Sequence, residues 1–538
     1  MIPFRRSHRA LIMGRRGAVA TNHPVATQAG LDTLRAGGNA ADATAAISLT
    51  LGVVEPHMSG LGGDGFYHVW MAAAGKGTVY NGTGVAPAAA TPDKFADGMA
   101  VNGPRSVSVP GLLAGIGMMH AAHGVLPWAR VVQPAIAAAR DGFAATHGYR
   151  TFSGNARQLL RADPRSGATF LHEGEVPALG DLIVQPDLAA TLETIAADGA
   201  ETFYRGRLAR LLAEGLAEAG TLIGAADLAD LKAEEQAPIG ITYRGYEVRQ
   251  TPPNSTGFVL LEELKILEQF DLAALPYDSA ELIHLLVEAK KYAFLDRERY
   301  GMDPRFGTVP LDRILSEAHA RANAAKIDRA RAASVPLSFE APNEGDTTYF
   351  CVVDADGNAV SAIQSINSVF GSGVTAGRTG ILLNNRMAYW HLDPRHPNVL
   401  VPGKRVRHTM NAPMILKDGK PWAVLGTPGA DNQVQVNLQA VVNLIDYGVD
   451  PQHAAEAPRW TSSQPGQGAN WPHAGDEGLT VEEGLPEATY AGLRAKGHDL
   501  RMVPPLEGAC SLECIRILDN GVRMAGSDPR RDGWAGAY

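Results

Sequence analysis

The chain has 538 residues, of which 45% are hydrophobic and 20% are charged, a composition that is ordinary for a folded globular protein and excludes a disordered one. Its length suits roughly two to four domains or one large layered fold, and its formal net charge of -9 argues against nucleic-acid binding, which depends on clustered Lys and Arg. Three cysteines make no disulfide framework, and no histidine cluster accompanies them at zinc-binding spacing, so we expect neither a metal nor another cofactor.

The N-terminal segment is basic, but its only apolar stretch, residues 10–13, is too short for the core of a signal peptide. No run of 18 apolar residues occurs. The longest candidate, residues 40–54, is interrupted by Asp42 and by hydroxyl side chains, so we expect no membrane span. These features favour a cytoplasmic protein.

Helical patterns dominate the first part of the chain. Residues 25–36 and 40–51 are predicted to form two helices, separated by a Gly-Gly pair that suits a left-handed helix end. Helical spacing returns over 106–145 and 185–235. It is clearest over 279–299, where apolar residues recur on one face at i, i+3, i+4 and i+7.

A glycine-rich stretch, SGLGGDG at residues 59–65, precedes a predicted strand over 66–71. It superficially resembles a phosphate-binding loop, but the Lys-Ser or Lys-Thr of such a loop does not follow it. We therefore interpret it as a tight packing turn near the functional site.

The pattern changes at residue 346. Residues 330–346 contain two prolines, a glycine and three acidic residues without periodicity, which predicts an exposed loop. The chain is mostly strand-like after that loop, in the segments 347–353, 358–367, 380–385, 413–416 and 422–427. We expect a helix-rich part, residues 1–346, and a strand-rich part, residues 347–538, that together form one intertwined fold.

Residues 354–358, Asp-Ala-Asp-Gly-Asn, form a turn signal between two of these strand-like runs. Centring the loop on Asp356 places Thr347 directly opposite Ser365, with Cβ atoms about 4.5–5.5 Å apart. Asn367 lies two residues further along and points to the same face. A bulge would shift this register by one residue. The alternative interpretation is a set of polar side chains on a solvated sheet face.

The segment TTYFCVVDADGNAVSAIQSINSVFGSGV, starting at Thr347, resembles the beginning of the small subunit of γ-glutamyltransferases, an N-terminal-nucleophile hydrolase family. The resemblance covers nearly the whole chain, and its blocks follow one another in the family's order. The other blocks are ATNHPVATQAGLDTLRAGGNAADATAA, GVVEPHMSGLGGDGF, PPNSTG, EAKKYAFLDRERYGMDPRF, GILLNNRM, GTPGADNQ, NLIDYGVDPQHAAEAPRW and SDPRRDGWAGAY.

The resemblance implies an α+β fold, a four-layer αββα sandwich assembled from two chains after self-cleavage. It implies that Thr347 attacks the carbonyl of Asp346, that an ester forms, and that water then releases Thr347 as a new N-terminus. A threonine hydroxyl is a weak nucleophile, and the freed α-amino group, with an ordinary pKa of about 7.7–8.0, is well suited to act as its base. Thr348 should face the opposite way, since it is one residue further along the strand.

The resemblance also implies supporting roles. Ser365 takes the position of a second hydroxyl, often Thr in the family, that hydrogen-bonds the nucleophile, and Asn367 matches an Asn that orients the amine or the substrate. Gly429 and Ala430 match a Gly-Gly pair whose backbone N–H groups form the oxyanion hole, where losing one donor typically costs about 10²–10³ in rate. Alanine keeps the N–H but resists a positive φ, so we expect a shifted loop if the family geometry requires one.

The sequence departs from the family where a γ-glutamyl group is recognised. Thr83 stands where an Arg binds the α-carboxylate, and Tyr389 stands where an Asp binds the α-ammonium. Arg386 replaces a Gln, and His408-Thr409 replaces a Ser-Ser pair. With Tyr in place of Asp, no obvious anion remains for an ammonium, whereas Arg386 adds a cation suited to a carboxylate. The alternatives are a surface salt bridge for Arg386 and a packed polar role for His408.

We therefore expect a self-processing amidohydrolase that cleaves a small carboxylate-bearing acyl amide, oxamate-like or glutaryl-like, through an acyl-threonine ester. Two alternatives remain: a γ-glutamyltransferase or glutathione hydrolase with an altered pocket, and an unprocessed non-catalytic relative. The expected partners are the small-molecule substrate, water, and the large and small fragments of one precursor, with a dimer of heterodimers left open. We expect neither a nucleic-acid nor a membrane partner.

Overall fold

The computed structural model, which describes residues 7–337 and 346–538, has two seven-stranded antiparallel sheets at its centre. We call the sheet that contains the predicted hairpin sheet I and the other sheet II. The strands of sheet I, in spatial order, are β19 (Trp534–Ala537), β2 (Ala18–Thr21), β10 (Asp346–Val353), β11 (Ala359–Asn367), β3 (Asp64–Met71), β4 (Lys76–Gly82) and β7 (Glu234–Gln236). The strands of sheet II, in spatial order, are β1 (Ile12–Gly14), β18 (Arg523–Ser527), β17 (Glu513–Ile517), β13 (Lys420–Gly426), β12 (Met414–Lys417), β9 (Tyr246–Gln250) and β8 (Ile239–Tyr243).

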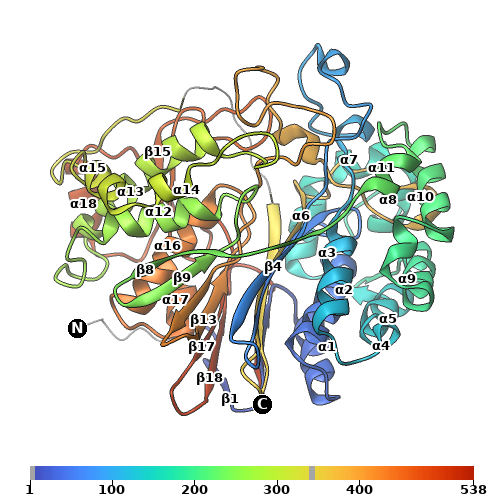
Figure 1. Cartoon of the computed structure of the whole chain (residues 1–538), viewed down its shortest axis with the longest axis horizontal. Coiled ribbons are helices and arrows are strands. Elements are labelled where there is room, and N and C mark those ends of the chain that lie inside the picture. Colours follow the sequence, from blue (N-terminus) through green and yellow to red (C-terminus); the bar gives the residue numbers. More distant parts are fainter. Residues whose placement is uncertain (1–6, 338–345) are drawn as a thin grey trace.

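Helices cover the outer face of each sheet (Figure 1). The helices packed on sheet I are α1 (Pro24–Arg35), α2 (Ala40–Val54), α3 (Leu112–His123), α4 (Trp128–Val131), α5 (Gln133–Asp141), α6 (His147–Asn155), α7 (Arg157–Ala162), α8 (Pro164–Phe170), α9 (Pro186–Asp198), α10 (Arg207–Glu218) and α11 (Ala225–Asp230). Those packed on sheet II are α12 (Gly257–Leu267), α13 (Ala280–Tyr300), α14 (Leu311–Ile314), α15 (Glu317–Ala324), α16 (Asn432–Ile445), α17 (Pro451–Glu456) and α18 (Glu487–Ala495).

Smaller elements lie outside these layers. One small sheet contains β14 (Trp460–Ser463), β15 (Gly478–Glu482) and β16 (Leu500–Val503), and another contains β5 (Phe143–Ala144) and β6 (Leu182–Ile183). Short 3₁₀ helices are η1 (Pro92–Phe95), η2 (Pro104–Ser106), η3 (Ala200–Phe203), η4 (Gly377–Thr379) and η5 (Arg386–Tyr389).

The inner strands of sheet I, β2, β10, β11 and β3, are buried on both faces. In β10, Phe350 and Val352 point into the core beneath α1–α11, whereas Tyr349 and Cys351 point into the core between the two sheets. Side chains alternate along a strand, so a strand with two covered faces is apolar almost throughout. The predicted four-layer αββα sandwich of the α+β class is confirmed.

The predicted helices over 25–36, 40–51 and 279–299 are confirmed by α1, α2 and α13. Helix α13 begins after Ser279, whose hydroxyl oxygen accepts a hydrogen bond from the Leu282 N–H at 3.2 Å. The predicted strand over 66–71 corresponds to β3, which starts two residues earlier.

The strand predicted over 380–385 is wrong. Its amides bond singly to separate parts of the chain: Leu383 N–H donates to the carbonyl of Val374, and Asn384 N–H donates to that of Gly62. An apolar run of this length is compatible with a strand, but the segment forms only isolated bridges, between Leu382 and Thr375 and between Leu383 and Gly62. The segment leads into η5 at Arg386.

Both central sheets combine strands from before and after residue 346. Sheet I takes β2, β3, β4 and β7 from the earlier part, and β10, β11 and β19 from the later part. Of the loop predicted over 330–346, residues 331–337 form neither helix nor strand, 338–345 lie outside the described residues, and Asp346 already opens β10. Within the described chain, no helix has the length and apolar character needed to cross a lipid bilayer.

Candidate active site

The β10–β11 hairpin follows the predicted register for most of its length. The pairs run from Val353–Ala359 to Thr348–Gln364, all centred on Asp356. The five-residue loop therefore fixes which side chains face one another, as the sequence predicts.

A β-bulge interrupts the register at the open end of the hairpin. Asp346 pairs with Asn367, and Thr347 lies at the irregularity between Asp346 and Thr348. The Thr347 hydroxyl nevertheless donates a hydrogen bond to Ser365 Oγ at 3.3 Å. The predicted meeting of these two hydroxyl groups is confirmed, within a buried environment.

Asn367 reaches Ser365 through its backbone. Its N–H donates to Ser365 Oγ at 2.8 Å, and its φ of 82° lies in the left-handed region. The side-chain amide donates to the carbonyl of Asn385 at 3.1 Å and to Asn470 Oδ1 at 2.9 Å. Asn367 thus connects the hydroxyl pair to the segment that carries η5.

Thr348 has a different environment from Thr347. Its hydroxyl oxygen accepts a hydrogen bond from Asn22 Nδ2 at 3.2 Å, and Asn22 in turn accepts one from the Ser511 hydroxyl at 2.7 Å. This contact with the β2–α1 connection agrees with the prediction that Thr348 points away from Ser365.

The glycine-rich stretch packs directly against the end of β11. A Cβ at Gly63 would lie 2.3 Å from the Ser365 carbonyl oxygen, and one at Gly62 would lie 2.1 Å from that of Leu382. Any larger residue would clash with backbone there, so the interpretation as a packing turn is confirmed. The turn brings Asp64, the first residue of β3, opposite Ser365.

Asp64 is the site residue that the sequence analysis missed. Its Oδ2 lies 3.2 Å from Arg386 Nε and 3.4 Å from His408 Nε2, and its Oδ1 accepts from the Gly84 N–H at 2.7 Å. Asp64, Arg386 and His408 are all buried. An acidic residue inside a glycine-rich turn was the only signal in the sequence.

Arg386 is therefore part of a buried ion pair with Asp64, and the alternative of a surface salt bridge is wrong. Its Nη1 donates to Asn367 Oδ1 at 3.2 Å, and its guanidinium carbon lies 4.6 Å from the centre of the Tyr389 ring. Its buried Nη2 has no hydrogen-bond partner among the described residues.

The charges of this group follow from opposing effects. Burial raises the pKa of the Asp64 carboxyl, but the hydrogen bond from His408 and the charge of Arg386 outweigh it, so the net pKa is lowered. Burial and the Arg386 charge lower the pKa of His408 to about 4. At neutral pH a neutral His408 donates from Nε2 to an ionised Asp64, while its Nδ1 accepts from the Met410 N–H at 3.4 Å.

Tyr389 closes one side of this group. Its hydroxyl lies 3.2 Å from Thr409 Oγ1, and both residues are buried. The ring lies beside the Arg386 guanidinium, with the His408 ring 6.3 Å away. Tyr389 and Thr409 thus lie beside Arg386 and His408 on one side of this group.

Thr83 contacts a second buried guanidinium, that of Arg405. Arg405 Nη1 donates to Thr83 Oγ1 at 3.2 Å, its Nη2 donates to the Lys232 carbonyl at 2.7 Å, and Glu234 lies 3.2 Å from it. Arg405 also lines a surface cavity of about 650 Å³. The sequence analysis missed this contact because 322 residues separate its partners.

Gly429 and Ala430 lie in the loop between β13 and α16. Their φ angles are 118° and 48°, so Ala430 adopts the left-handed conformation that its Cβ disfavours by roughly 1–2 kcal/mol. Tyr349 packs against Gly426, where a Cβ would come within 2.3 Å of the ring, which sets the end of β13 beside β10. The loop therefore has the conformation of a glycine pair.

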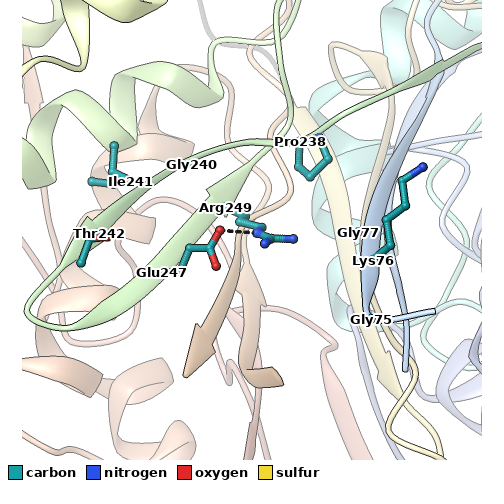
Figure 2. Close-up of a pocket in the computed structure, with 9 residues that line it drawn as sticks. All are labelled: Gly75, Lys76, Gly77, Pro238, Gly240, Ile241, Thr242, Glu247 and Arg249. Carbon is teal, nitrogen blue, oxygen red and sulfur yellow. Dashed lines mark hydrogen bonds and ion pairs between the residues drawn. The ribbon is translucent and has the colours of Figure 1, made fainter. Parts of the chain in front are cut away.

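A shallow hollow of about 480 Å³ lies elsewhere, between β4 and the β8–β9 hairpin (Figure 2). Arg249 in its floor contacts Glu247 at 2.6 Å and lies over the Trp70 ring at 5.3 Å. The residues lining it include none of the predicted site residues: they are Gly75, Lys76, Gly77, Pro238, Gly240, Ile241, Thr242, Glu247 and Arg249. We therefore place the candidate active site at the hairpin end and not in this hollow.

Buried histidines make the stability of the fold depend on pH. Burial lowers the pKa to about 4 in His23, His68, His408 and His473. Each regains a pKa near 6.5 on unfolding, so the unfolded chain binds more protons, and stability present above pH 6.5 is lost as the pH falls towards 4, by about 1.4 kcal/mol per pH unit for each histidine. We expect the thermal midpoint to fall steeply between pH 6.5 and 4.5.

Differential scanning fluorimetry across that range measures the effect. His68 lies away from the hairpin end and contacts the Ala412 carbonyl through Nδ1 at 2.9 Å. A His68→Gln variant should show a shallower decline, because one titrating group is gone. A midpoint that stays constant down to pH 4.5 would contradict this explanation.

Comparison with known proteins supports membership in the family that the sequence blocks resemble. Residues 26–538 match the model of a family described as gamma-glutamyltranspeptidase. The chain is 37% identical over 530 residues to a glutathione hydrolase-like proenzyme of Bacillus subtilis, covering 97% of this chain and 99% of that protein. It is 34% identical over 532 residues to the oxamate amidohydrolase proenzyme of Klebsiella pneumoniae, covering 97% and 98%.

The crystal structure of a cephalosporin acylase from Bacillus halodurans has a TM-score of 0.89 to this fold at 33% identity, covering 100% of this chain and 98% of that one. Family model, relatives and structure agree with the resemblance carried by the sequence blocks. The chain belongs to the gamma-glutamyltranspeptidase family of hydrolases and transferases.

Proposed function

We propose that this protein is a self-processing amidohydrolase in which Thr347 cleaves the amide bond of a small acyl group that carries a carboxylate. The proposal rests mainly on the hydrogen bond between the hydroxyl groups of Thr347 and Ser365, which lie 3.3 Å apart. Thr347 directly follows Asp346, so its hydroxyl is next to the peptide bond that would be cut. A hydroxyl held by a second hydroxyl, next to the bond to be cut, is arranged for nucleophilic attack.

Processing would occur in two steps. Thr347 Oγ1 attacks the carbonyl carbon of Asp346, and the peptide C–N bond breaks, which leaves an ester and a free α-amino group on Thr347. Water then hydrolyses the ester, so that Asp346 ends in a carboxylate and the threonine hydroxyl is restored. The description of relatives as proenzymes supports this sequence of events.

The two fragments, residues 1–346 and 347–538, would remain associated as a heterodimer. Strand β10 of the smaller fragment pairs with β2 of the larger one, through Phe350 with Thr21 and Val352 with Val19. Strand β11 pairs with β3 over seven residues. Cutting one bond leaves these ladders in place.

Turnover would use the freed amine as the base. As Thr347 Oγ1 attacks the substrate amide carbon, the α-amino group takes the hydroxyl proton and passes it to the leaving amine. The acyl-threonine ester is then hydrolysed by water. The backbone N–H groups of Gly429 and Ala430 are our candidates for stabilising the negative oxygen of each tetrahedral intermediate.

The charges around Arg386 favour an acyl group with a carboxylate and without an ammonium. Arg386 Nη2 remains for a carboxylate oxygen, as a charge-assisted hydrogen bond. Asp64, the nearby anion, already accepts from Gly84 and contacts Arg386 and His408, so its charge is shared with a buried cation. An ammonium group there would compete with Arg386 for the same carboxylate and would lose its hydration on burial. Oxamate-like and glutaryl-like amides fit this description.

A panel of substrates tests the proposal. We expect kcat/KM for oxamate or glutaryl amides to exceed that for γ-glutamyl-p-nitroanilide by roughly tenfold or more, since one unpaired charge costs more than 1.4 kcal/mol. Succinamate and an uncharged butyramide serve as controls for length and charge. Efficient turnover of the γ-glutamyl substrate alone would reject the proposed acyl class and favour a glutathione hydrolase with an altered pocket.

A further inference from the structure

Three helices on the outer face of sheet II bring together a polar cluster of Glu262 from α12, Asp296 from α13, and His319 and Asn323 from α15. His319 Nε2 lies 2.6 Å from Asp296 Oδ2 and 3.1 Å from Glu262 Oε1. Glu262, Asp296 and Asn323 are buried, and the His319 side chain is 16% exposed, which gives the cluster access to solvent.

With both carboxyl groups ionised, the donors of this cluster do not satisfy its acceptors. If His319 Nε2 carries a hydrogen, it faces the Asn323 Nδ2 donor at 3.1 Å, and the orientation of that amide is fixed because its Oδ1 accepts from Lys326 Nζ at 2.8 Å. If Nε2 carries a lone pair, it faces two carboxylate oxygens. In either state, Glu262 Oε2 is buried without a hydrogen-bond partner among the described residues. Buried carboxylate oxygens without partners are rare and call for an explanation.

A divalent cation held by His319 Nε2 and both carboxylates would remove these conflicts if Glu262 bound it through Oε2. Zinc bonds to imidazole nitrogen and carboxylate oxygen are about 2.0–2.2 Å long, so the ligand atoms of a tetrahedral ion lie about 3.4 Å apart. Here His319 Nε2 lies 3.1 Å from Glu262 Oε1 and 2.6 Å from Asp296 Oδ2, so a small outward shift of Asp296 would admit the ion. The two carboxylates supply the charge that a divalent ion neutralises.

Two similar clusters in the described part of the chain lack this feature. In the cluster of His284, Glu288 and His498, both Glu288 oxygens are bonded, to Lys291 Nζ at 2.8 Å and to the Ala333 N–H at 3.1 Å.

In the cluster of Glu298, His391 and His396, the carboxylate is shared by two guanidinium groups, Arg407 at 2.8 Å and Arg297 at 3.1 Å. Positive charges at that distance oppose cation binding. Of the three clusters, the α12–α13–α15 cluster is the one with a buried carboxylate oxygen that lacks a hydrogen-bond partner among the described residues.

We propose that Glu262, Asp296 and His319 bind a zinc-class divalent cation that fastens α15 to α12 and α13. Asn323 then supports the site by donating to Glu262 Oε1 at 3.2 Å. The ligands come from three separate helices, which is why the sequence, lacking a short ligand motif, led us to expect no metal. The proposal is independent of the proposed reaction.

Metal binding by the full-length, chelator-treated protein tests the proposal. Added Zn²⁺ should bind at one equivalent per chain by isothermal titration calorimetry and by elemental analysis after gel filtration, and it should raise the thermal midpoint. Asp296→Asn and His319→Gln should each weaken binding by roughly 100-fold or more, since each removes one of three ligands. Substituted Co²⁺ should show visible absorption bands that both variants lose.

His498→Gln is the matched control, because it changes a cluster of the same composition whose carboxylate is already satisfied. It should leave Zn²⁺ binding unchanged. If His319→Gln fails to fold, Asp296→Asn decides, since it keeps the shape of the side chain. The absence of stoichiometric binding in the wild type, unchanged binding in the folded ligand variant, or an equal loss in His498→Gln would overturn the proposal.

Discussion

Replacement of Thr347 by alanine is expected to leave the protein as one uncut chain and to lower turnover by at least about 10⁴-fold, the scale seen when a covalent nucleophile is removed. The wild-type preparation should contain two fragments of about 37 and 20 kDa, by their shares, 346 and 192, of the 538 residues in the 56.9 kDa chain. Intact-mass measurement also identifies the cut, because the smaller fragment must begin at Thr347.

Two further variants show whether cutting depends on the hydroxyl of Thr347 itself or on other residues near it. Thr347→Ser keeps a hydroxyl at the position that contacts Ser365, so it should still cut, with altered speed. Thr348→Ala is the matched control: its hydroxyl contacts Asn22, and its loss should leave cutting intact. Cutting by Thr347→Ala, or full activity of the uncut chain, would reject Thr347 as the nucleophile.

Replacement of Asp64 by asparagine is expected to lower the free energy of unfolding by about 3–5 kcal/mol, the typical result of leaving a buried charge without its partner. Arg386 is 2% exposed on its side chain and Asp64 is 1% exposed, so water cannot take over the lost contact. Turnover of carboxylate-bearing substrates should fall as well, because Asp64 holds the guanidinium through Nε at 3.2 Å. Denaturation and steady-state kinetics measure the two effects separately.

A double-mutant cycle with Arg386→Gln isolates the pair. Asp64→Asn with Arg386→Gln should recover most of the lost stability but not the preference for carboxylate substrates, since the charge is gone. Arg157 and Glu175 form a comparable contact at 2.7 Å on the surface, with side chains 40% and 61% exposed, and their cycle should give less than about 1 kcal/mol. A coupling energy near zero for Asp64 and Arg386 would contradict the buried pair.

The local part of the site was predictable and the non-local part was not. The register of the hairpin followed from a symmetric five-residue turn, which determines its own pairing over the adjacent residues. The bulge at Thr347 was not predictable, because it depends on how the end of β10 meets the rest of sheet I. The predicted contact of Thr347 with Ser365 is nevertheless present, because the two hydroxyl groups remain within hydrogen-bonding distance at the bulge.

The pairing of Asp64 with Arg386 joins residues that are 322 positions apart, and periodicity carries no information about such a contact. Arg386 was recognised by its departure from a family pattern, whereas Asp64 was recognised only as part of a turn. The segment 380–385 was predicted as a strand because its apolar composition suits one, although its amides find partners in three different parts of the chain.

Both central sheets combine strands from the two sides of residue 346. This arrangement affects how the protein can refold after it has unfolded. An uncut chain refolds by a first-order process, because all strands of each sheet are tethered to one another. Once the bond before Thr347 is cut, the same sheets can be rebuilt only by an encounter of two polypeptides, at a rate that falls with dilution. Unfolding of the mature enzyme would then be effectively irreversible at low concentration, so its lifetime would depend on the barrier to unfolding and not on the equilibrium stability of the fold.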